Sequence, residues 1–310
     1  LGPDDVAFRC NLVTLGDGLM RDYSAGHIET ADARALIGEL GERLGSADCR
    51  FYPGVSYRHL VVLTGFDNPS IETTPPHDIS GRQWKEHLPR NDGGAALVDM
   101  MTKAAAVLAD SETNRRRIAA GKQPATDIWL WGQGKAMRVP TLMERYQLTG
   151  SVVSAVDLVR GLGVLAAMRV RLVEGATGYL GTNYAGKVEA ASEALNEEDL
   201  VFLHVEAPDE TSHEGSLEKK LQAIEEFDAN IVDPILRLRS TIPRLRILVA
   251  PDHATPISLK THHAAPVPFA ACGSGLRPDG ANRYCERAAE NAPPYTGTSL
   301  FDAFVKGTFQ

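Results

Sequence analysis

Two short apolar runs, each followed at once by potential metal ligands, constrain this chain more than any other feature of its sequence. Residues 200–205 and 245–250 are rich in branched apolar side chains and are bounded by polar turns. This pattern predicts two buried strands of an α/β sheet. Asp209 and His213 follow the first run, and the sequence Pro251-Asp-His253 follows the second.

A third group, Lys260-Thr-His-His263, lies a few residues further on, and five of the nine histidines fall between His204 and His263. Ligands that follow two different parallel strands can meet, because the loops at the carboxyl ends of such strands form one crevice. Carboxylate oxygen and imidazole nitrogen suit divalent metals such as Zn²⁺ or Mn²⁺. One Asp-x-x-x-His spacing often arises by chance, and a lone buried histidine is commonly a core residue. The metal prediction therefore depends on all three groups.

Composition narrows the class of protein. The chain has 310 residues, 43% hydrophobic and 23% charged, which is long enough for a large core and two domains. Its net charge is −8, and without a stripe of Lys and Arg it offers no electrostatic footprint for nucleic acid. The local exception, Asn114-Arg-Arg-Arg117, is interpreted as a basic run that caps a helix end or faces solvent.

Cysteine spacing and hydropathy bear on the compartment. The four cysteines are far apart and form no Cys-x-x-Cys pair, which predicts reduced thiols in a cytoplasmic protein. No apolar run approaches the ~20 residues that a membrane span needs, so we expect no membrane segment. The sequence does not indicate an oligomeric state.

The first part of the chain predicts a small domain of strands and helices. Leu36, Leu40 and Leu44 recur at four-residue spacing and predict an amphipathic helix at 30–44, with Thr30 as its N-cap. The other predicted elements are a strand at 5–14, a strand or bent pair of strands at 50–63, a long ordered loop at 65–90 and a helix at 94–119.

From residue 127 onward, alternating strands and helices predict a doubly wound α/β domain. The predicted elements around the two ligand-bearing strands are strands at 127–131 and 169–173 and helices at 151–162, 187–195 and 217–235. Gly175-Ala-Thr-Gly178 is too short and irregular for a phosphate loop, so we expect a plain turn. The stretch Gly121-Lys-Gln-Pro-Ala125 marks a boundary between domains 1–122 and 123–310.

The ligand-bearing motifs also resemble a known family. Read together, Ala207-Pro-Asp-Glu-Thr-Ser-His-Glu-Gly215, Pro251-Asp-His253 and Thr261-His-His-Ala-Ala-Pro-Val-Pro268 resemble cofactor-independent phosphoglycerate mutases of the archaeal type, in the alkaline phosphatase superfamily. Further motifs extend the resemblance over nearly the whole chain: Asp5-Val-Ala-Phe-Arg-Cys-Asn11, Asp22-Tyr-Ser-Ala-Gly-His27, Phe51-Tyr-Pro-Gly-Val-Ser-Tyr-Arg-His59, Trp129-Leu-Trp-Gly-Gln-Gly134 and Gly175-Ala-Thr-Gly-Tyr179.

The resemblance implies an α/β fold with an alkaline-phosphatase-like doubly wound sheet domain and a smaller inserted α+β domain. Residues 1–122 would be the inserted substrate-binding domain, and residues 123–310 the C-terminal part of the metal-binding core. The implied cofactors are two divalent metal ions (Mn²⁺, Zn²⁺ or Mg²⁺), which activate a nucleophilic alkoxide and hold the charge of the transferring phosphoryl group.

Specific residues match the ligand positions of the family. Asp209, His213 and His262 match the ligands of one metal. Asp252 and His253 match two ligands of the other. His262 is preferred over His263 because the family's histidine stands four residues before the first proline of the Pro-Val-Pro turn.

The implied substrate is a small phosphorylated carboxylic acid, and its anionic groups require arginines and histidines. Arg9, His27, Arg58 and His77 are the candidates in the first domain. The alternative for each of them is a surface ion pair or a structural hydrogen bond.

No catalytic nucleophile is assigned. In the family, an Asp in an Asp-Gly-Met type motif and a nucleophilic Ser complete the second metal site, and both precede the region where this sequence begins. We therefore expect a segment before Leu1 to supply that serine, and we expect no turnover from the 310 residues alone. Ser212 is an ordinary loop residue in the motif and receives no nucleophilic role. Gly181 departs from the family, which usually has Asp there.

The leading hypothesis is a cytoplasmic isomerase of glycolysis and gluconeogenesis that interconverts 3-phosphoglycerate and 2-phosphoglycerate through a phosphoserine. One alternative is a related metal-dependent phosphatase or phosphomutase with another substrate, because specificity lies in the inserted domain. The other alternative is a non-catalytic truncated chain that at most binds metal or a partner.

Overall fold

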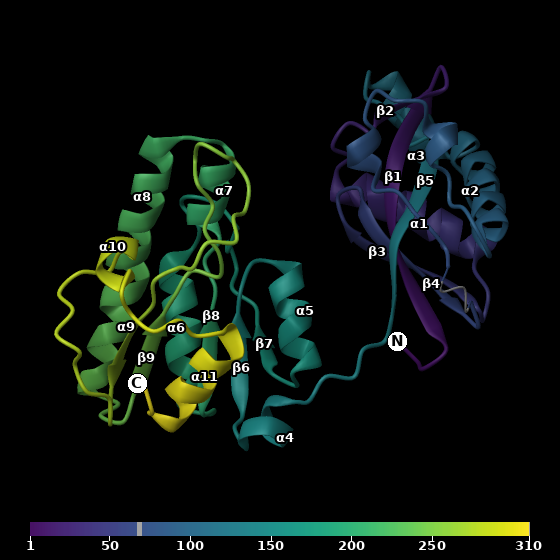
Figure 1. Ribbon diagram of the computed structural model, residues 1–310. Coiled ribbons are helices and arrows are strands. Elements are labelled where there is room, and N and C mark those ends of the chain that lie inside the picture. The colour runs from purple at the N-terminus through teal and green to yellow at the C-terminus, as the bar shows by residue number, and fades with distance from the viewer. Residues whose placement is uncertain (67–69, 310) are drawn as a thin grey trace. The chain divides into compact units, whose positions relative to one another are not determined.

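The computed structural model describes residues 1–66 and 70–309, and the chain divides into two compact units, Leu1–Met137 and Arg138–Gln310 (Figure 1). The boundary lies after the one expected at residue 122. Strand β5 (Asp127–Lys135), predicted in the second domain, pairs antiparallel with β1 (Asp5–Gly16) of the first unit. Backbone pairing between distant strands is not visible in local sequence patterns, and it decides this assignment.

An antiparallel sheet of five strands forms the centre of the first unit. β1 pairs with β5 and with β4 (Arg58–Thr64), and its end pairs with β2 (Leu19–Asp22). β3 (Cys49–Val55) pairs with β4, so the bent pair of strands predicted at 50–63 is a hairpin.

Three helices accompany this sheet: α1 (Thr30–Leu44), α2 (Gly94–Ala109) and α3 (Glu112–Ala119). The helix predicted at 30–44 is confirmed, but Thr30 is not its N-cap. That position is Glu29, and the Thr30 hydroxyl accepts a hydrogen bond from the Ser56 amide instead. The single helix predicted at 94–119 is two helices. Apolar side chains of the helices and strands share one core, which includes Phe8, Leu12, Leu36, Leu40, Leu97, Leu108 and Trp129.

The loop predicted at 65–90 contains two short 3₁₀ turns, Pro76–Ile79 and Trp84–His87; residues 67–69 of that prediction lie outside the described residues. Side chains of β5 hold the loop against the sheet. Trp129 Nε1 donates to the Thr74 carbonyl at 2.8 Å, and Gln133 Nε2 donates to the Ile71 carbonyl at 2.9 Å. Ile71 and Thr74 of the loop are therefore held beside β5.

The basic run at 114–117 does not simply face solvent. The Arg117 side chain is only 3% exposed, pairs with Asp32 at 2.9 Å and donates to the carbonyls of Ala25 and Gln123. Asn114 is also buried, and its amide bonds the backbone of Ala125 in both directions. These bonds tie α3 to the chain segment that leads into β5, because buried polar groups must find partners.

The second unit contains two small sheets. β6 (Gly150–Val153) lies between β7 (Arg169–Arg171) and β8 (Leu200–Leu203) in a parallel sheet. β9 (Arg246–Val249) pairs antiparallel with β10 (Ala270–Gly273), a strand that sequence reasoning missed. Among the described residues β8 and β9 are not bonded to each other, and Phe202 of β8 is 52% exposed. The prediction that both runs are buried was wrong.

The helix predicted at 151–162 was also wrong in its first part. Residues 150–153 form β6, because the branched side chains of Val152 and Val153 are fully buried in the parallel sheet. The helix that follows is α5 (Asp157–Leu165). A short apolar run does not distinguish a buried strand from a buried helix by its periodicity.

Further helices surround these strands (Figure 1). The amphipathic helix predicted at 217–235 consists of α8 (Leu217–Phe227), a π-helical turn at Asp228–Val232 and α9 (Asp233–Arg237). The remaining helices are α4 (Leu142–Tyr146), α6 (Tyr184–Ala194), α7 (Ala207–His213), α10 (Glu286–Ala289), α11 (Gly297–Lys306) and a 3₁₀ turn at Leu238–Ser240. None of the helices in the described residues has the length and apolar character to cross a bilayer.

His59 makes the stability of the first unit sensitive to mild acid. The ring is 3% exposed, Nδ1 accepts a hydrogen bond from the Gly54 amide, and Nε2 has no partner among the described residues. Burial lowers the pKa of His59 from 6.5 to about 4. The folded state therefore binds this proton less tightly than the unfolded chain does, and protonation favours unfolding.

We predict that the free energy of unfolding of the first unit falls by up to about 3 kcal/mol as the pH drops from 6.5 to 4. The three tryptophans, Trp84, Trp129 and Trp131, all belong to this unit, so urea titrations followed by their fluorescence measure the effect. In His59→Leu the fall over this pH range should be smaller by that amount. An equal fall in both proteins would contradict the assignment.

Candidate functional site

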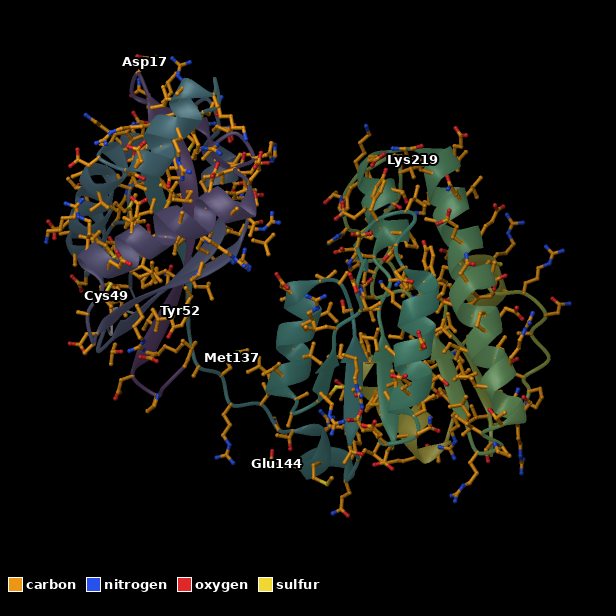
Figure 2. All side chains as sticks on the ribbon, turned by 180° about the vertical axis from the view of Figure 1, so that it is seen from behind. Asp17, Cys49, Tyr52, Met137, Glu144 and Lys219 are labelled. Carbon is orange, nitrogen blue, oxygen red and sulfur yellow. The ribbon has the colours of Figure 1, made fainter. Side chains whose placement is uncertain are left out.

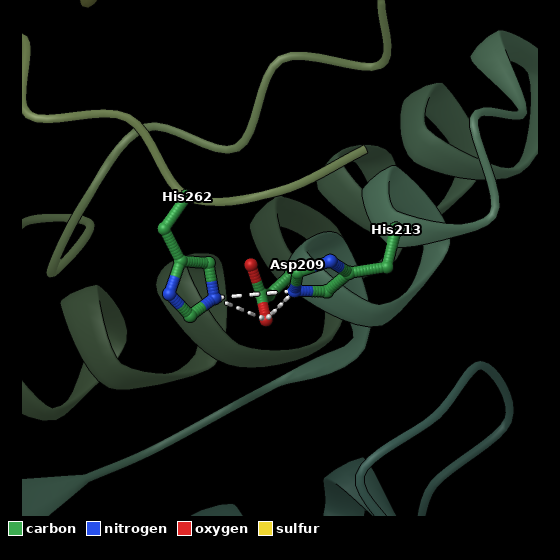
Figure 3. Close-up of side chains that lie close together, drawn as sticks. All are labelled: Asp209, His213 and His262. Atoms are coloured by element: carbon green, nitrogen blue, oxygen red, sulfur yellow. Dashed lines mark hydrogen bonds and ion pairs between the residues drawn. The ribbon is translucent and has the colours of Figure 1, made fainter. Parts of the chain in front are cut away.

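Helix α7 places the first two predicted ligands on one face. Asp209 and His213 are four residues apart, so their side chains are neighbours on the helix. His213 Nε2 lies 3.1 Å from Asp209 Oδ2 and 3.1 Å from Nε2 of His262, which comes from the loop after β9 (Figure 3). His262 Nε2 is 3.6 Å from Asp209 Oδ2. Within the part of the chain that the structure describes, this is the only group of three such ligands whose atoms lie within 4.8 Å of one another.

The orientation of His213 follows from its other ring nitrogen. Nδ1 lies 3.0 Å from the Lys260 carbonyl oxygen, which can only accept, so Nδ1 carries the hydrogen. In the neutral ring, Nε2 then presents a lone pair to the Asp209 carboxylate. Two acceptors at this distance repel unless a proton or a cation lies between them. The bond to Lys260 and the nearby Asp209 raise the pKa of His213, as this geometry requires.

Asp209 is the group that all these contacts share. Its side chain is 24% exposed, and this partial burial by itself raises its pKa. The hydrogen bond from Thr255 and the neighbouring His213, His262 and His253 outweigh that effect, so the net pKa of Asp209 is lowered. The carboxylate is therefore ionised at neutral pH. One carboxylate and two imidazoles with a further open position match the ligand set of catalytic zinc sites.

The second predicted pair lies next to this cluster. His253 Nε2 is 3.3 Å from Asp252 Oδ2, and the His253 ring lies 3.7 Å, centroid to centroid, from the ring of His262. His253 Nδ1 is 4.0 Å from Asp209 Oδ1. The structure thus brings all five predicted ligands together, although the second pair offers only two of the ligands a cation needs.

Two neighbours of the predicted ligands have other partners. The His263 amide donates to the Ala254 carbonyl at 2.8 Å, and its ring accepts from the Ala265 amide at 3.2 Å, so His263 is outside the cluster. Ser212 is fully buried and its hydroxyl donates to the Pro208 carbonyl. The hydrogen of the Ser212 hydroxyl is therefore used within the helix.

The turn at residues 175–178 is connected to the end of helix α7, which carries Asp209 and His213. Tyr179 donates from its hydroxyl to Glu214, the residue after His213, and Lys219 donates to both of them; Figure 2 labels Lys219 near the start of α8. Gly178 lies directly against the carboxylate of Glu206, where a side chain would collide. Sequence reasoning missed this network, because nothing in the spacing of Tyr179 and Lys219 indicates that they meet.

The four predicted substrate residues lie in the first unit, beside or within a row of four rings: Trp131, His77, Tyr23 and Tyr57. We call these rings, together with Arg9, His27 and Arg58, the aromatic row. The Arg9 guanidinium stacks 4.7 Å above the Trp131 ring, whose other neighbour, His77, is 5.4 Å away. Trp131 Nε1 donates to Asn11 Oδ1 at 3.1 Å.

The other end of the aromatic row carries the remaining two candidates. Tyr23 contacts His77 at 6.1 Å and Tyr57 at 5.6 Å between centroids. His27 lies 6.4 Å from Tyr57, and the Arg58 guanidinium stacks 4.7 Å from the same ring. The side chains of all four candidates are exposed, so the row holds two arginines and two histidines at the surface of one unit.

The chain is similar to known proteins over most of its length. A family model described as 2,3-bisphosphoglycerate-independent phosphoglycerate mutase matches residues 1–114. The protein of that name from Methanosarcina barkeri is 54% identical over 271 residues, which cover 87% of this chain and 68% of the relative. A probable 2,3-bisphosphoglycerate-independent phosphoglycerate mutase from Geobacter sulfurreducens is 51% identical over 297 residues, covering 94% and 74%.

Solved structures agree on the fold. A protein from Pyrococcus horikoshii matches with a TM-score of 0.73 at 25% identity, covering 93% of this chain and 69% of its own. The cofactor-independent phosphoglycerate mutase from Thermoplasma acidophilum matches with a TM-score of 0.67 at 23% identity, covering 99% and 77%.

The fold and the cluster define an α/β protein of two units with a histidine and carboxylate centre that suits a divalent cation. The identities with its relatives go further: the chain belongs to the family of 2,3-bisphosphoglycerate-independent phosphoglycerate mutases.

Proposed function

We propose that this protein is an isomerase that interconverts 3-phosphoglycerate and 2-phosphoglycerate. The observation that carries the proposal is the cluster of Asp209, His213 and His262, in a chain about half of whose residues are identical to those of relatives named for this activity. Such a ligand set can hold a divalent cation for metal-dependent phosphoryl transfer. We place the reaction in the cytoplasm and in glycolysis and gluconeogenesis.

Two divalent cations, Mn²⁺, Zn²⁺ or Mg²⁺, are the proposed cofactors. Asp209, His213 and His262 would hold one of them, and Asp252 and His253 would contribute to holding the other. Bound cations lower the pKa of a coordinated hydroxyl and neutralise the charge of a phosphoryl group. The chain itself fixes the ligands: the Lys260 carbonyl orients His213, and Thr255 orients Asp209.

The aromatic row is the proposed substrate surface. Its arginines supply planar, permanently charged donors that match carboxylate and phosphate oxygens. Stacking on Trp131 and Tyr57 restricts the motion of Arg9 and Arg58, so less conformational entropy is lost when an anion binds.

The finer architecture follows from these roles. The first unit would be the inserted substrate-binding domain, and the second would be part of an alkaline-phosphatase-like core. The ligands that follow β8 and those that follow β9 meet at one place, which supports a common crevice at the carboxyl ends of both strands.

Turnover of 3-phosphoglycerate tests the function. The natural protein that contains these 310 residues should form 2-phosphoglycerate, measured by coupling to enolase, in the presence of Mn²⁺ and should lose this activity after chelation. Phosphate release without 2-phosphoglycerate would instead support the alternative of a metal-dependent phosphatase. A folded protein that binds Mn²⁺ and forms neither product would support the non-catalytic alternative.

The role of the aromatic row predicts a selective effect on substrate binding. We expect Arg9→Ala to raise the KM for 3-phosphoglycerate at least about tenfold, because a hydrogen bond to a charged group is lost. Arg115→Ala is the matched control, since Arg115 is an exposed arginine of the same unit that, among the described residues, pairs with Glu112 alone. Equal KM values in the parent and Arg9→Ala would exclude Arg9 from the substrate site.

The register of the histidine pair predicts different metal affinities. His262→Ala should weaken Mn²⁺ or Zn²⁺ binding by at least about tenfold, because it removes one of three ligands, whereas His263→Ala should change it little. Isothermal titration calorimetry of the metal-free protein measures both. Equal losses in the two variants would show that His262 is the wrong ligand.

A further inference from the structure

Thr255 lies between the two sets of predicted ligands. It follows β9 by a few residues and is only 6% exposed. Its hydroxyl is 2.5 Å from Asp209 Oδ1 and 3.2 Å from His253 Nδ1. Its carbonyl accepts a hydrogen bond at 2.8 Å from Lys220 of α8. Thr255 thus contacts one ligand from each set while α8 holds its backbone.

The hydrogen-bond directions at this hydroxyl are determined by chemistry. The ionised Asp209 carboxylate only accepts, so the Thr255 hydroxyl donates its single hydrogen to it. The Thr255 oxygen can then only accept from His253, which requires the hydrogen of a neutral His253 ring to be on Nδ1. The lone pair of that ring is left on Nε2, the atom that lies 3.3 Å from Asp252 Oδ2. As at His213, two acceptors this close repel unless a cation or a proton lies between them.

We propose that Thr255 is a positioning residue that couples the two predicted cation positions. Its hydroxyl fixes the rotation of the Asp209 carboxylate in one ligand set. The same hydroxyl selects the His253 tautomer that presents Nε2 as a ligand atom in the other. This inference rests on the proposed function, because it takes Asp209 and His253 to be metal ligands. It assigns Thr255 a role in both positions without direct contact with a cation.

Polar partners of this kind orient metal ligands in proteins, and their loss typically weakens metal binding about 10- to 100-fold. The side chain of valine has nearly the shape of threonine but lacks the hydroxyl. Serine keeps the hydroxyl and loses only a methyl group. Comparing Thr255→Val with Thr255→Ser therefore separates the hydrogen bonds from packing.

Thr211 provides a matched control. It is a fully buried threonine in α7, between Asp209 and His213, and within the described part of the chain its hydroxyl donates only to carbonyls of its own helix. Thr211→Val removes a buried hydroxyl close to the same ligands without touching their side-chain hydrogen bonds. It reports the effect of a general loss of stability on metal binding.

The experiment measures Mn²⁺ binding to the metal-free protein by isothermal titration calorimetry, with circular dichroism as a check that each variant is folded. We expect Thr255→Val to weaken binding at least tenfold, Thr255→Ser to stay within about threefold of the parent, and Thr211→Val to bind like the parent. If Thr255→Val does not fold, Thr255→Ala takes its place.

Nitrogen-15 NMR of the histidine rings in the metal-free protein gives a second readout. His253 should be the Nδ1–H tautomer in the parent and in Thr255→Ser, and should lose this preference in Thr255→Val. Unchanged Mn²⁺ affinity in Thr255→Val, or an Nε2–H tautomer in the parent, would overturn the inference alone. A parent protein that binds no Mn²⁺ would overturn the proposed metal centre and this inference with it.

Discussion

The carboxylate of Asp209 is the group on which the candidate site depends. One of its oxygens accepts from Thr255, and the other faces the Nε2 atoms of His213 and His262. A partly buried carboxylate is stable as an ion only where donors or cations surround it. Thr255 in the loop after β9 supplies one such donor, and the Nε2 atoms of His213 and His262 leave a position beside the other oxygen that a proton or a cation can fill. These contacts connect the loop after β9 to helix α7.

Backbone groups and charged side chains hold that loop in place. The Lys260 carbonyl bonds His213, the His263 amide bonds the Ala254 carbonyl, and Lys220 bonds the Thr255 carbonyl. These contacts connect the loop to α7, to itself and to α8. The ligands therefore do not rely on pairing between β8 and β9, which belong to separate sheets in the described residues.

The first unit presents positive charge at its surface. Arg9 comes from β1, where it alternates with the buried Phe8 and Cys10, and it stacks on Trp131 of the neighbouring β5. The antiparallel pairing of these two strands places a cation on a ring. The aromatic row contains residues from two strands, two loops and a hairpin. The sequence predicted its charged members, but it did not predict the rings that they contact.

Local sequence patterns predicted those features that depend on short stretches of the chain alone. The four-residue spacing of Leu36 and Leu40 predicts α1 with its correct bounds, and the Asp209 to His213 spacing already places two ligands on one helix face. Tertiary structure decided the rest, because it depends on contacts between distant residues. It made β6 a strand rather than a helix, assigned β5 to the first unit and buried Arg117. It also set Thr255 between Asp209 and His253, since a hydroxyl has no preferred partner until folding brings a donor and an acceptor within reach of it.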